Sequence, residues 1–231
     1  MANATVSRQR SSALRSTVAM KAIMAVSGLA MAAWLILHMV GNLKIFEGQE
    51  GFDNYSAWLR ELGYPALPHE GALWIMRVVL LAAILAHIYT AAVLTIRDRR
   101  ARPVRYQSTK RVQRTYASYT LRWGGVLLAL FIVYHLLHLT ANVIHPGGAS
   151  DSPYERVVNG FQIWWVTGFY LLAVAALGLH LRHGIWSALA TLGFNNARRE
   201  RAISLTATVV ATALFVGFIV PPLAVLIGVV N

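Results

Sequence analysis

The sequence contains no cysteine. That absence excludes disulfide bonds, thioether attachment of a c-type haem, and any thiolate-ligated iron–sulfur cluster within the chain. A metal ion would have to be held by histidine, methionine, tyrosine or carboxylate side chains. Histidine is the first choice among these, because the chain has eight histidines.

Charged residues are also scarce, at 13 % of the chain, whereas 57 % of the residues are hydrophobic. The mean hydropathy of +0.52 is that of a membrane protein and excludes an ordinary water-soluble globule. A net charge of +12 could suit nucleic acid. The basic residues, however, gather in the short segments between apolar runs, as membrane topology requires, so we expect no nucleic-acid partner.

Five apolar runs are each long enough to cross the ~30 Å hydrocarbon core as a helix. We therefore predict an all-α integral membrane bundle, with one transmembrane domain over residues 1–231. The fourth run exceeds the minimum length and should tilt or emerge from the bilayer. Pro221 and Pro222 should kink or interrupt the fifth. The predicted spans are 18–41, 73–96, 117–143, 160–191 and 203–230.

The distribution of charge predicts the orientation. Basic residues precede the first run without a cleavage site after it, which indicates a retained span and not a signal peptide. Further basic residues follow the second and fourth runs, whereas the first and third connections carry most of the acids. The N-terminus is therefore expected in the cytoplasm and the C-terminus outside. The basic residues are Arg8, Arg10, Arg15 and Lys21, eight between Arg97 and Arg114, and Arg198, Arg199 and Arg201.

The first external connection contains a second kind of helix. Residues 51–62 place Phe52, Tyr55, Trp58 and Leu62 at helical spacing with charged residues between them. This pattern predicts a short amphipathic helix at the outer membrane interface.

Four of the predicted spans hold a histidine within the apolar run: His38, His87, His135 and His180. Ionisable side chains inside a bilayer cost several kcal/mol and need partners. His87 lies about nine residues before the inner end of its span, or roughly 14 Å deep at ~1.5 Å per residue. Because alternate spans run in opposite directions, His38 and His135 should share an outer level, and His87 and His180 an inner level.

Two facing histidines at each of two levels are what two bis-histidine b-type haems require, with the macrocycles filling the space between four helices. A fifth helix would pack outside. Glycines would let helices and porphyrin edges approach, and the candidates are Gly28, Gly124, Gly125, Gly168, Gly178 and Gly184. A lone intramembrane histidine is more often structural, and a histidine proton relay or metal transporter remains the alternative.

Two further histidines stand three residues after predicted ligands, and so face nearly the same way. His138 follows His135, and His183 follows His180. Both are expected nearer the membrane surfaces, where they suit contacts to haem propionates or water. They are also the substitutes should His135 or His180 not be the ligand. His69 and His145 are expected at the outer interface.

Three segments resemble the single-subunit, five-helix cytochrome b anchors of bacterial succinate dehydrogenases and fumarate reductases. The first is His38-Met39-Val40-Gly41-Asn42, and the second is Arg122-Trp123-Gly124-Gly125 followed ten residues later by His135. The third, His180-Leu181-Arg182-His183-Gly184-Ile185-Trp186-Ser187, is the most specific. The match around His87 rests on depth and order. The resemblance favours His135 over His138 and His180 over His183.

The resemblance implies an anchor in the cytoplasmic (inner) membrane that holds a flavoprotein and an iron–sulfur subunit. It implies two b haems, a membrane quinone of the menaquinone type in many members, and electron transfer between succinate and quinone. The chain would perform no bond chemistry on succinate. The basic segment from Arg97 to Arg114 would dock the iron–sulfur subunit. The equally simple interpretation of this segment is topogenic charge in contact with anionic lipid.

Four other residues are candidates for cofactor contacts. Arg122 and Arg182 stand near span ends, where a cation could neutralise haem propionates. Glu70 and Arg77 lie at the outer start of the second span and could serve a quinone and its protons. The simpler interpretation, which we prefer from the sequence, is an interfacial helix cap and a snorkelling side chain.

Two rival functions remain open at this stage. A histidine-relay transporter or channel should show a polar stripe along its spans, which this chain lacks apart from the histidines. A dihaem b subunit of a hydrogenase or formate dehydrogenase would share the haems but have a different soluble partner. The pattern around His180 argues against it.

Overall fold

The computed structural model describes residues 16–101 and 116–231, and within these ranges every regular element is a helix. Five helices are long and apolar enough to cross a membrane, which confirms the predicted all-α bundle of five spans. The elements are α1 (Thr17–Leu43), a 3-10 turn (Lys44–Glu47), α2 (Gly48–Glu61), α3 (Gly71–Arg100), α4 (Tyr116–His135), a π-helical turn (Leu136–Thr140), α5 (Pro153–Phe161), α6 (Trp164–Thr191) and α7 (Glu200–Leu226).

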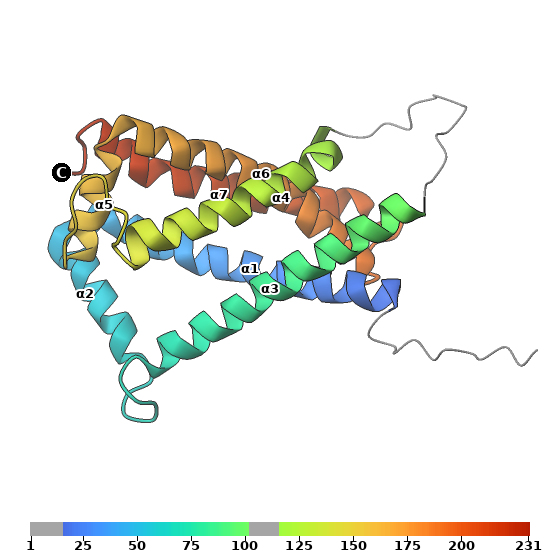
Figure 1. Cartoon of the computed structure of the whole chain (residues 1–231), viewed down its shortest axis with the longest axis horizontal. Coiled ribbons are helices and arrows are strands. Elements are labelled where there is room, and N and C mark those ends of the chain that lie inside the picture. The colour runs from blue at the N-terminus through green and yellow to red at the C-terminus, as the bar shows by residue number, and fades with distance from the viewer. Residues whose placement is uncertain (1–15, 102–115) are drawn as a thin grey trace, which may run out of the picture.

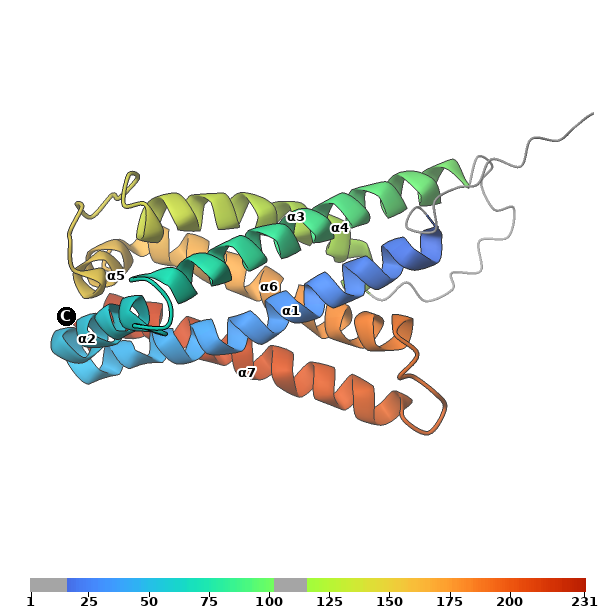
Figure 2. The same cartoon turned by 90° about the horizontal axis from the view of Figure 1, so that it is seen from below.

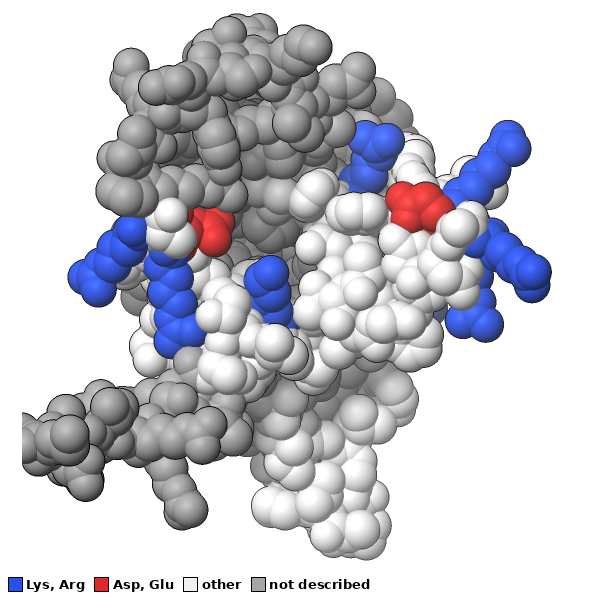
Figure 3. Space-filling model, turned by 90° about the vertical axis from the view of Figure 1, so that its right-hand side faces the viewer, with Lys and Arg blue, Asp and Glu red and all other residues white. Residues whose placement is uncertain are grey.

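The five long helices run along the long axis of the molecule, and the two short helices lie together at one end (Figures 1 and 2). We call that end, with α2, α5 and the C-terminal residues, the capped end. The opposite end contains the start of α1, the end of α3 and the connection between α6 and α7. We call it the basic end, because Arg and Lys side chains surround it (Figure 3). Its described arginines in those segments are Arg97, Arg99, Arg100, Arg198, Arg199 and Arg201.

The predicted fourth span, 160–191, divides into two helices. Ser152 caps α5 by accepting a hydrogen bond from the Glu155 N–H at 3.2 Å, and Pro153 occupies the first turn. Ile163 then takes an extended conformation, and α6 begins at Trp164. Residues 160 and 161 therefore belong to α5. The predicted start was wrong because hydropathy continues across a break that is made by backbone geometry.

The other predicted boundaries shift by at most four residues. The third span ends in the π-helical turn Leu136–Thr140, three residues before the predicted end. The interfacial helix begins at Gly48, before the predicted residue 51. Helix α7 runs through Pro221 and Pro222 to Leu226, so the prolines do not interrupt it. Both prolines are buried, and packing around them keeps the helix continuous.

Small side chains determine how closely α6 and α7 pack. Ala207 and Ala211 lie one turn apart on α7 and are 1 % and 4 % exposed. They belong to one buried cluster with Leu181 and Ile185 of α6 and Ala32 of α1. Small residues let helix backbones approach in a membrane, where van der Waals packing replaces the hydrophobic effect between helices.

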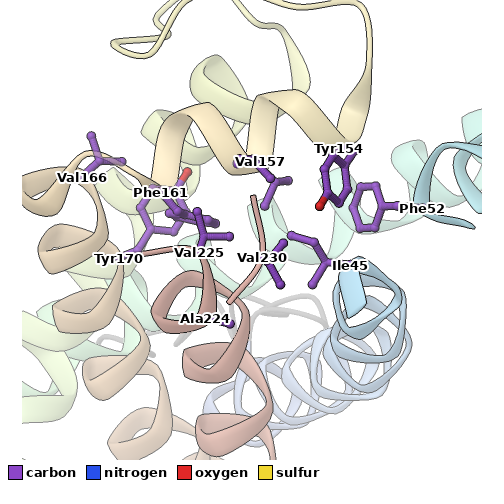
Figure 4. Packing of buried hydrophobic residues seen from close by; sticks show 11 residues of the cluster. Ile45, Phe52, Tyr154, Val157, Phe161, Val166, Tyr170, Ala224, Val225 and Val230 are labelled. Atoms are coloured by element: carbon purple, nitrogen blue, oxygen red, sulfur yellow. The ribbon is translucent and has the colours of Figure 1, made fainter. Parts of the chain in front are cut away.

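A second buried cluster closes the capped end (Figure 4). Phe52 of α2 and Tyr154 of α5 meet edge to face, with ring centroids 6.2 Å apart. Asp53 of α2 stabilises the same contact between α2 and α5. Its carboxylate accepts hydrogen bonds from the Ser152 hydroxyl at 2.6 Å and from the Tyr154 N–H at 3.0 Å. The C-terminal residue joins through its carbonyl, which accepts from the Tyr154 hydroxyl at 3.0 Å. The cluster consists of Ile45, Phe52, Tyr154, Val157, Val158, Phe161, Val166, Tyr170, Ala224, Val225 and Val230.

Helix α3 is the least buried of the five long helices. It packs along α1 and meets α2 at the capped end. Its outward side chains are apolar, and Val78, Leu81 and Leu85 are each about three-fifths exposed, at 61 %, 58 % and 58 %. An apolar surface of this kind suits contact with lipid chains.

Candidate functional site: two histidine pairs within the bundle

The first pair lies toward the basic end and joins α3 to α6. The ring centroids of His87 and His180 are 6.2 Å apart, with the ring planes at 62°. We call these residues the basic-side pair. Their helices do not follow one another in the chain, so the pairing is a product of the fold.

The second pair lies toward the capped end and joins α1 to α4. The ring centroids of His38 and His135 are 5.8 Å apart, with the planes at 84°. We call these residues the capped-side pair. The structure thus brings together the two pairs that were expected from depth, His38 with His135 and His87 with His180.

Both separations suit two imidazoles that share one metal ion. With a metal–nitrogen bond of roughly 2 Å on each side, the two ring centroids lie about 6 Å apart. The residues present therefore fit one bis-histidine iron at each level. Each ion would take one ring from each of two helices.

The hydrogen bond of His87 leaves its Nε2 available to bind a metal. Its Nδ1 lies 3.1 Å from the main-chain carbonyl oxygen of Met24, and 3.4 Å from the Ser27 hydroxyl. A carbonyl only accepts, so Nδ1 carries the proton and Nε2 keeps its lone pair for a metal. The Nδ1 of His180 is buried and has no partner among the described residues.

Glycines provide close approach around the basic-side pair. A Cβ on Gly28 of α1 would meet the His87 ring at 3.2 Å, and one on Gly125 of α4 would meet the His180 ring at 3.7 Å. The Cβ directions of Gly124 and Gly184 are open for at least 4 Å. Both belong to the motifs around Arg122 and His180, and their open space suits the edge of a flat cofactor.

Aromatic rings surround the capped-side pair. Trp34 stacks on His38 at 5.7 Å and Phe218 contacts it at 5.8 Å, while Phe131 lies 5.8 Å from His135. Tyr170 contacts His135 as well, with ring centroids 6.0 Å apart. This second layer of residues was not predicted, because an aromatic residue in a span carries no signal that distinguishes packing against a ligand from packing against lipid.

His138 is buried within the protein just beyond the end of α4. It is 0 % exposed, in the π-helical turn, and its Nδ1 lies 2.9 Å from the Tyr170 hydroxyl. Its ring also lies 4.5 Å from that of His145. Packing removes His138 from solvent completely, although it lies farther along the chain toward the capped end than His135.

The remaining candidates lie toward the two ends of the bundle. At the basic end, Arg122 forms an exposed ion pair with Asp98 at 3.2 Å, and Arg182 donates to the Thr208 hydroxyl at 3.2 Å. The ring of His183 lies 5.7 Å from that of Trp186.

At the capped end, Glu70 occupies the N-cap position of α3, but its side chain does not cap the helix. It pairs instead with Arg60 at 3.4 Å and Arg77 at 3.8 Å, and Arg77 lies over the Trp74 ring at 4.9 Å. Glu70 therefore stands at the helix start, as the simpler interpretation expected, while its carboxylate pairs with the two arginines and makes no capping hydrogen bond.

Part of the predicted docking segment lies outside the described residues. This part contains Arg102, Arg105, Lys110, Arg111 and Arg114. The basic residues Arg8, Arg10 and Arg15 of the N-terminal segment also lie outside the described residues. Of the described basic residues, Arg97 donates to the Thr17 hydroxyl at 3.2 Å.

Comparison with known proteins gives one match. The model of a family described as "Succinate dehydrogenase/Fumarate reductase transmembrane subunit" matches residues 96–219. That is more than half of the 231 residues, and it includes His135 and His180 but not His38 or His87. Neither a curated protein nor a solved structure matches the chain.

Proposed function

The chain belongs to the succinate dehydrogenase/fumarate reductase transmembrane subunit family, and from this premise we propose that it is the dihaem cytochrome b anchor of such an enzyme. It holds two b haems and mediates electron transfer between a cytoplasmic iron–sulfur subunit and membrane quinone. The observation that carries the proposal is the presence of two histidine pairs between apolar helices. The ring centroids are 5.8 Å apart within one pair and 6.2 Å apart within the other.

The four ligands of the proposal are His38 and His135 for one haem, and His87 and His180 for the other. Bound haem iron would supply one-electron transfer by changing between its ferrous and ferric states. The protein's part is to hold the rings apart at the ligation distance, to exclude water, and to keep Nδ1 of His87 protonated through the Met24 carbonyl.

The basic end is the proposed face for the soluble subunits. We place the chain in the inner (cytoplasmic) membrane. By the positive-inside rule, the basic end and the N-terminus then face the cytoplasm. Arginines there would attract an acidic iron–sulfur subunit, which in turn binds the flavoprotein. Arg122, Arg182 and His183 lie toward this end and are the proposed contacts for the propionates of the nearer haem. His138 was the other candidate for a propionate contact, but its contact to Tyr170 favours a role beside His135.

The quinone site is proposed at the capped end, at Glu70 and Arg77. Quinone reduction takes up protons, and Glu70 is a partly exposed carboxylate that two arginines hold at the start of α3. Menaquinone is the proposed quinone, on the resemblance of the three motifs to bacterial menaquinone-linked members of the family.

A haem count tests the proposal. The purified protein should show a reduced-minus-oxidised b-type spectrum and two haems per chain in a pyridine haemochrome assay. His135→Ala and His87→Ala should each lose one of the two, and Leu81→Ala, at an exposed position of α3, serves as the control. Copurification with a flavoprotein and an iron–sulfur subunit separates this function from that of other dihaem subunits. A folded, membrane-inserted protein without haem would contradict the proposal and favour a histidine relay.

A further inference from the structure

A line of ring contacts leads from His135 to the capped-end surface. The Tyr170 hydroxyl lies between two histidines, 2.9 Å from Nδ1 of His138 and 3.5 Å from Nδ1 of His135. His145 follows, with its ring centroid 4.5 Å from that of His138. The Nε2 of His145 lies 2.8 Å from the main-chain carbonyl oxygen of Arg156 in α5. These contacts join α4, α6, the π-helical turn and α5 in one path.

The carbonyl of Arg156 fixes the tautomer of His145 at the far end of this path. A carbonyl oxygen only accepts, so Nε2 of His145 must carry the proton and donate it. A neutral His145 then has a lone pair on Nδ1. That Nδ1 is buried and has no partner among the described residues.

His138 provides the matching donor. Its Nε2 is also buried, with no partner in the described part of the chain. No direct hydrogen bond joins it to Nδ1 of His145. If Nε2 carries the proton, it can donate to Nδ1 of His145 through one bridging water molecule, and two otherwise costly buried groups are satisfied. Nδ1 of His138 is then an acceptor, and the Tyr170 O–H donates to it.

The last step reaches the proposed haem ligand. Because the single proton of Tyr170 is committed to His138, its oxygen is free to accept from Nδ1–H of His135. His135 is thereby held as the tautomer whose Nε2 has a lone pair for a metal. In the opposite tautomer of His135, Nε2 would carry the proton and would have no lone pair for a metal.

We propose that Tyr170, His138 and His145 form a directed hydrogen-bond chain, anchored on the Arg156 carbonyl, that fixes the tautomer of His135 and strengthens it as a donor to iron. Tyr170 is its central positioning residue. The inference rests on the proposed function, since it takes His135 as a haem ligand. It also explains why the chain carries a second histidine three residues after the ligand: His138 serves the ligand and does not replace it.

The decisive experiment compares two tyrosines. Tyr170→Phe removes the bridging hydroxyl, whereas Tyr134→Phe removes a hydroxyl from the same ring cluster that is buried and has no partner in the described residues. Losing the acceptor makes the His135 imidazole a weaker donor to ferric iron. In Tyr170→Phe we therefore expect two haems per chain, a raised midpoint potential for the capped-side haem, and altered low-spin electron paramagnetic resonance of that haem alone. Variants of His38 and His87 assign the two haems.

A second pair of variants keeps the inference testable if Tyr170→Phe does not fold. His145→Leu should raise the same potential by a smaller amount, and His145→Gln, whose amide both donates and accepts, should restore it. An unchanged capped-side haem in Tyr170→Phe, equal shifts of both haems, or the same shift in Tyr134→Phe would overturn the chain. Absence of haem from the wild type would instead contradict the proposed function itself.

Discussion

The two histidine pairs have different supports, although they have similar ring separations. On the basic side, His87 is held by the main chain of α1, through the Met24 carbonyl, and packs against Gly28. On the capped side, His38 and His135 lie among Trp34, Phe131 and Tyr170. The basic-side pair is supported by the close approach of α1 and α3. The capped-side pair is supported by a layer of aromatic side chains. Substitutions should therefore affect the two levels by different routes.

The largest effect is expected from a bulky residue at Gly28. Gly28→Leu places a Cβ 3.2 Å from the His87 ring, with three more carbon atoms beyond it, and must push α3 away from α1 or turn the ring. We expect loss of one of the two haems with retention of the capped-side one. The haemochrome count measures this. Val26→Leu, at an exposed position of the same helix, is the control, and an equal loss there would contradict the contact.

The next effect tests the capped end through Gly160. A Cβ at Gly160 would lie 2.8 Å from two atoms of the His138 ring, and that ring is 0 % exposed and cannot move aside easily. Gly160→Ala should therefore destabilise the protein by about 1–3 kcal/mol, as overpacking does. The spectrum of the capped-side haem should change while the other stays the same. Thermal unfolding in detergent, followed by haem absorbance, measures both. Unchanged stability and an unchanged spectrum would show that the π-helical turn moves enough to accommodate the extra methyl group.

A smaller loss is expected where α2 is joined to α5. Asp53→Ala removes the acceptor for the Ser152 hydroxyl and the Tyr154 N–H, which should cost about 1–2 kcal/mol, as the loss of a helix cap does. Faster hydrogen exchange should appear in α5 first. Asp98→Ala at the basic end removes one exposed ion pair with Arg122 and should cost about 0–1 kcal/mol. Equal losses at the two sites would remove this contrast between the ends.

The smallest effect sharpens the comparison on the basic side. Ser27→Ala removes the 3.4 Å contact to His87 and the bonds that the hydroxyl donates to the Ile23 and Met24 carbonyls within α1. The bond between His87 and the Met24 carbonyl remains at 3.1 Å. The potential of the basic-side haem should change little in comparison with the effect of Tyr170→Phe on the other haem. A large change in a redox titration would show that the side chain, and not the backbone, holds His87.

Much of this site could be predicted from the sequence because a membrane simplifies the geometry. Helix length fixes depth, so counting residues along antiparallel spans was enough to pair His87 with His180 and His38 with His135. The division between α5 and α6 was not predicted, although Ser152, Pro153 and Glu155 form a capping-box pattern that indicates a helix start. Hydropathy does not detect such a break, because Phe161 and Ile163 are apolar on either side of it.

The layer of residues behind the ligands could not be predicted by the same means. Tyr170 and His138 are brought together by the rotation of α6 against the π-helical turn, and their spacing in the sequence contains no record of that rotation. The three-residue step from His135 to His138 suggested a shared face. A π-helical turn changes the angle per residue, and His138 packs into the protein at that point.

The sparse packing of α3 has a consequence for assembly. Four of the long helices form one packed unit along α1, α6 and α7 with α4 against α6, whereas α3 is attached to that unit along α1 and carries one ligand, His87. If the chain binds haem as proposed, α3 would be the last helix to pack during biogenesis, after a haem enters between it and α6. Without haem, protease should cleave at the ends of α3 before it reaches the rest of the bundle, and addition of haem should protect those sites.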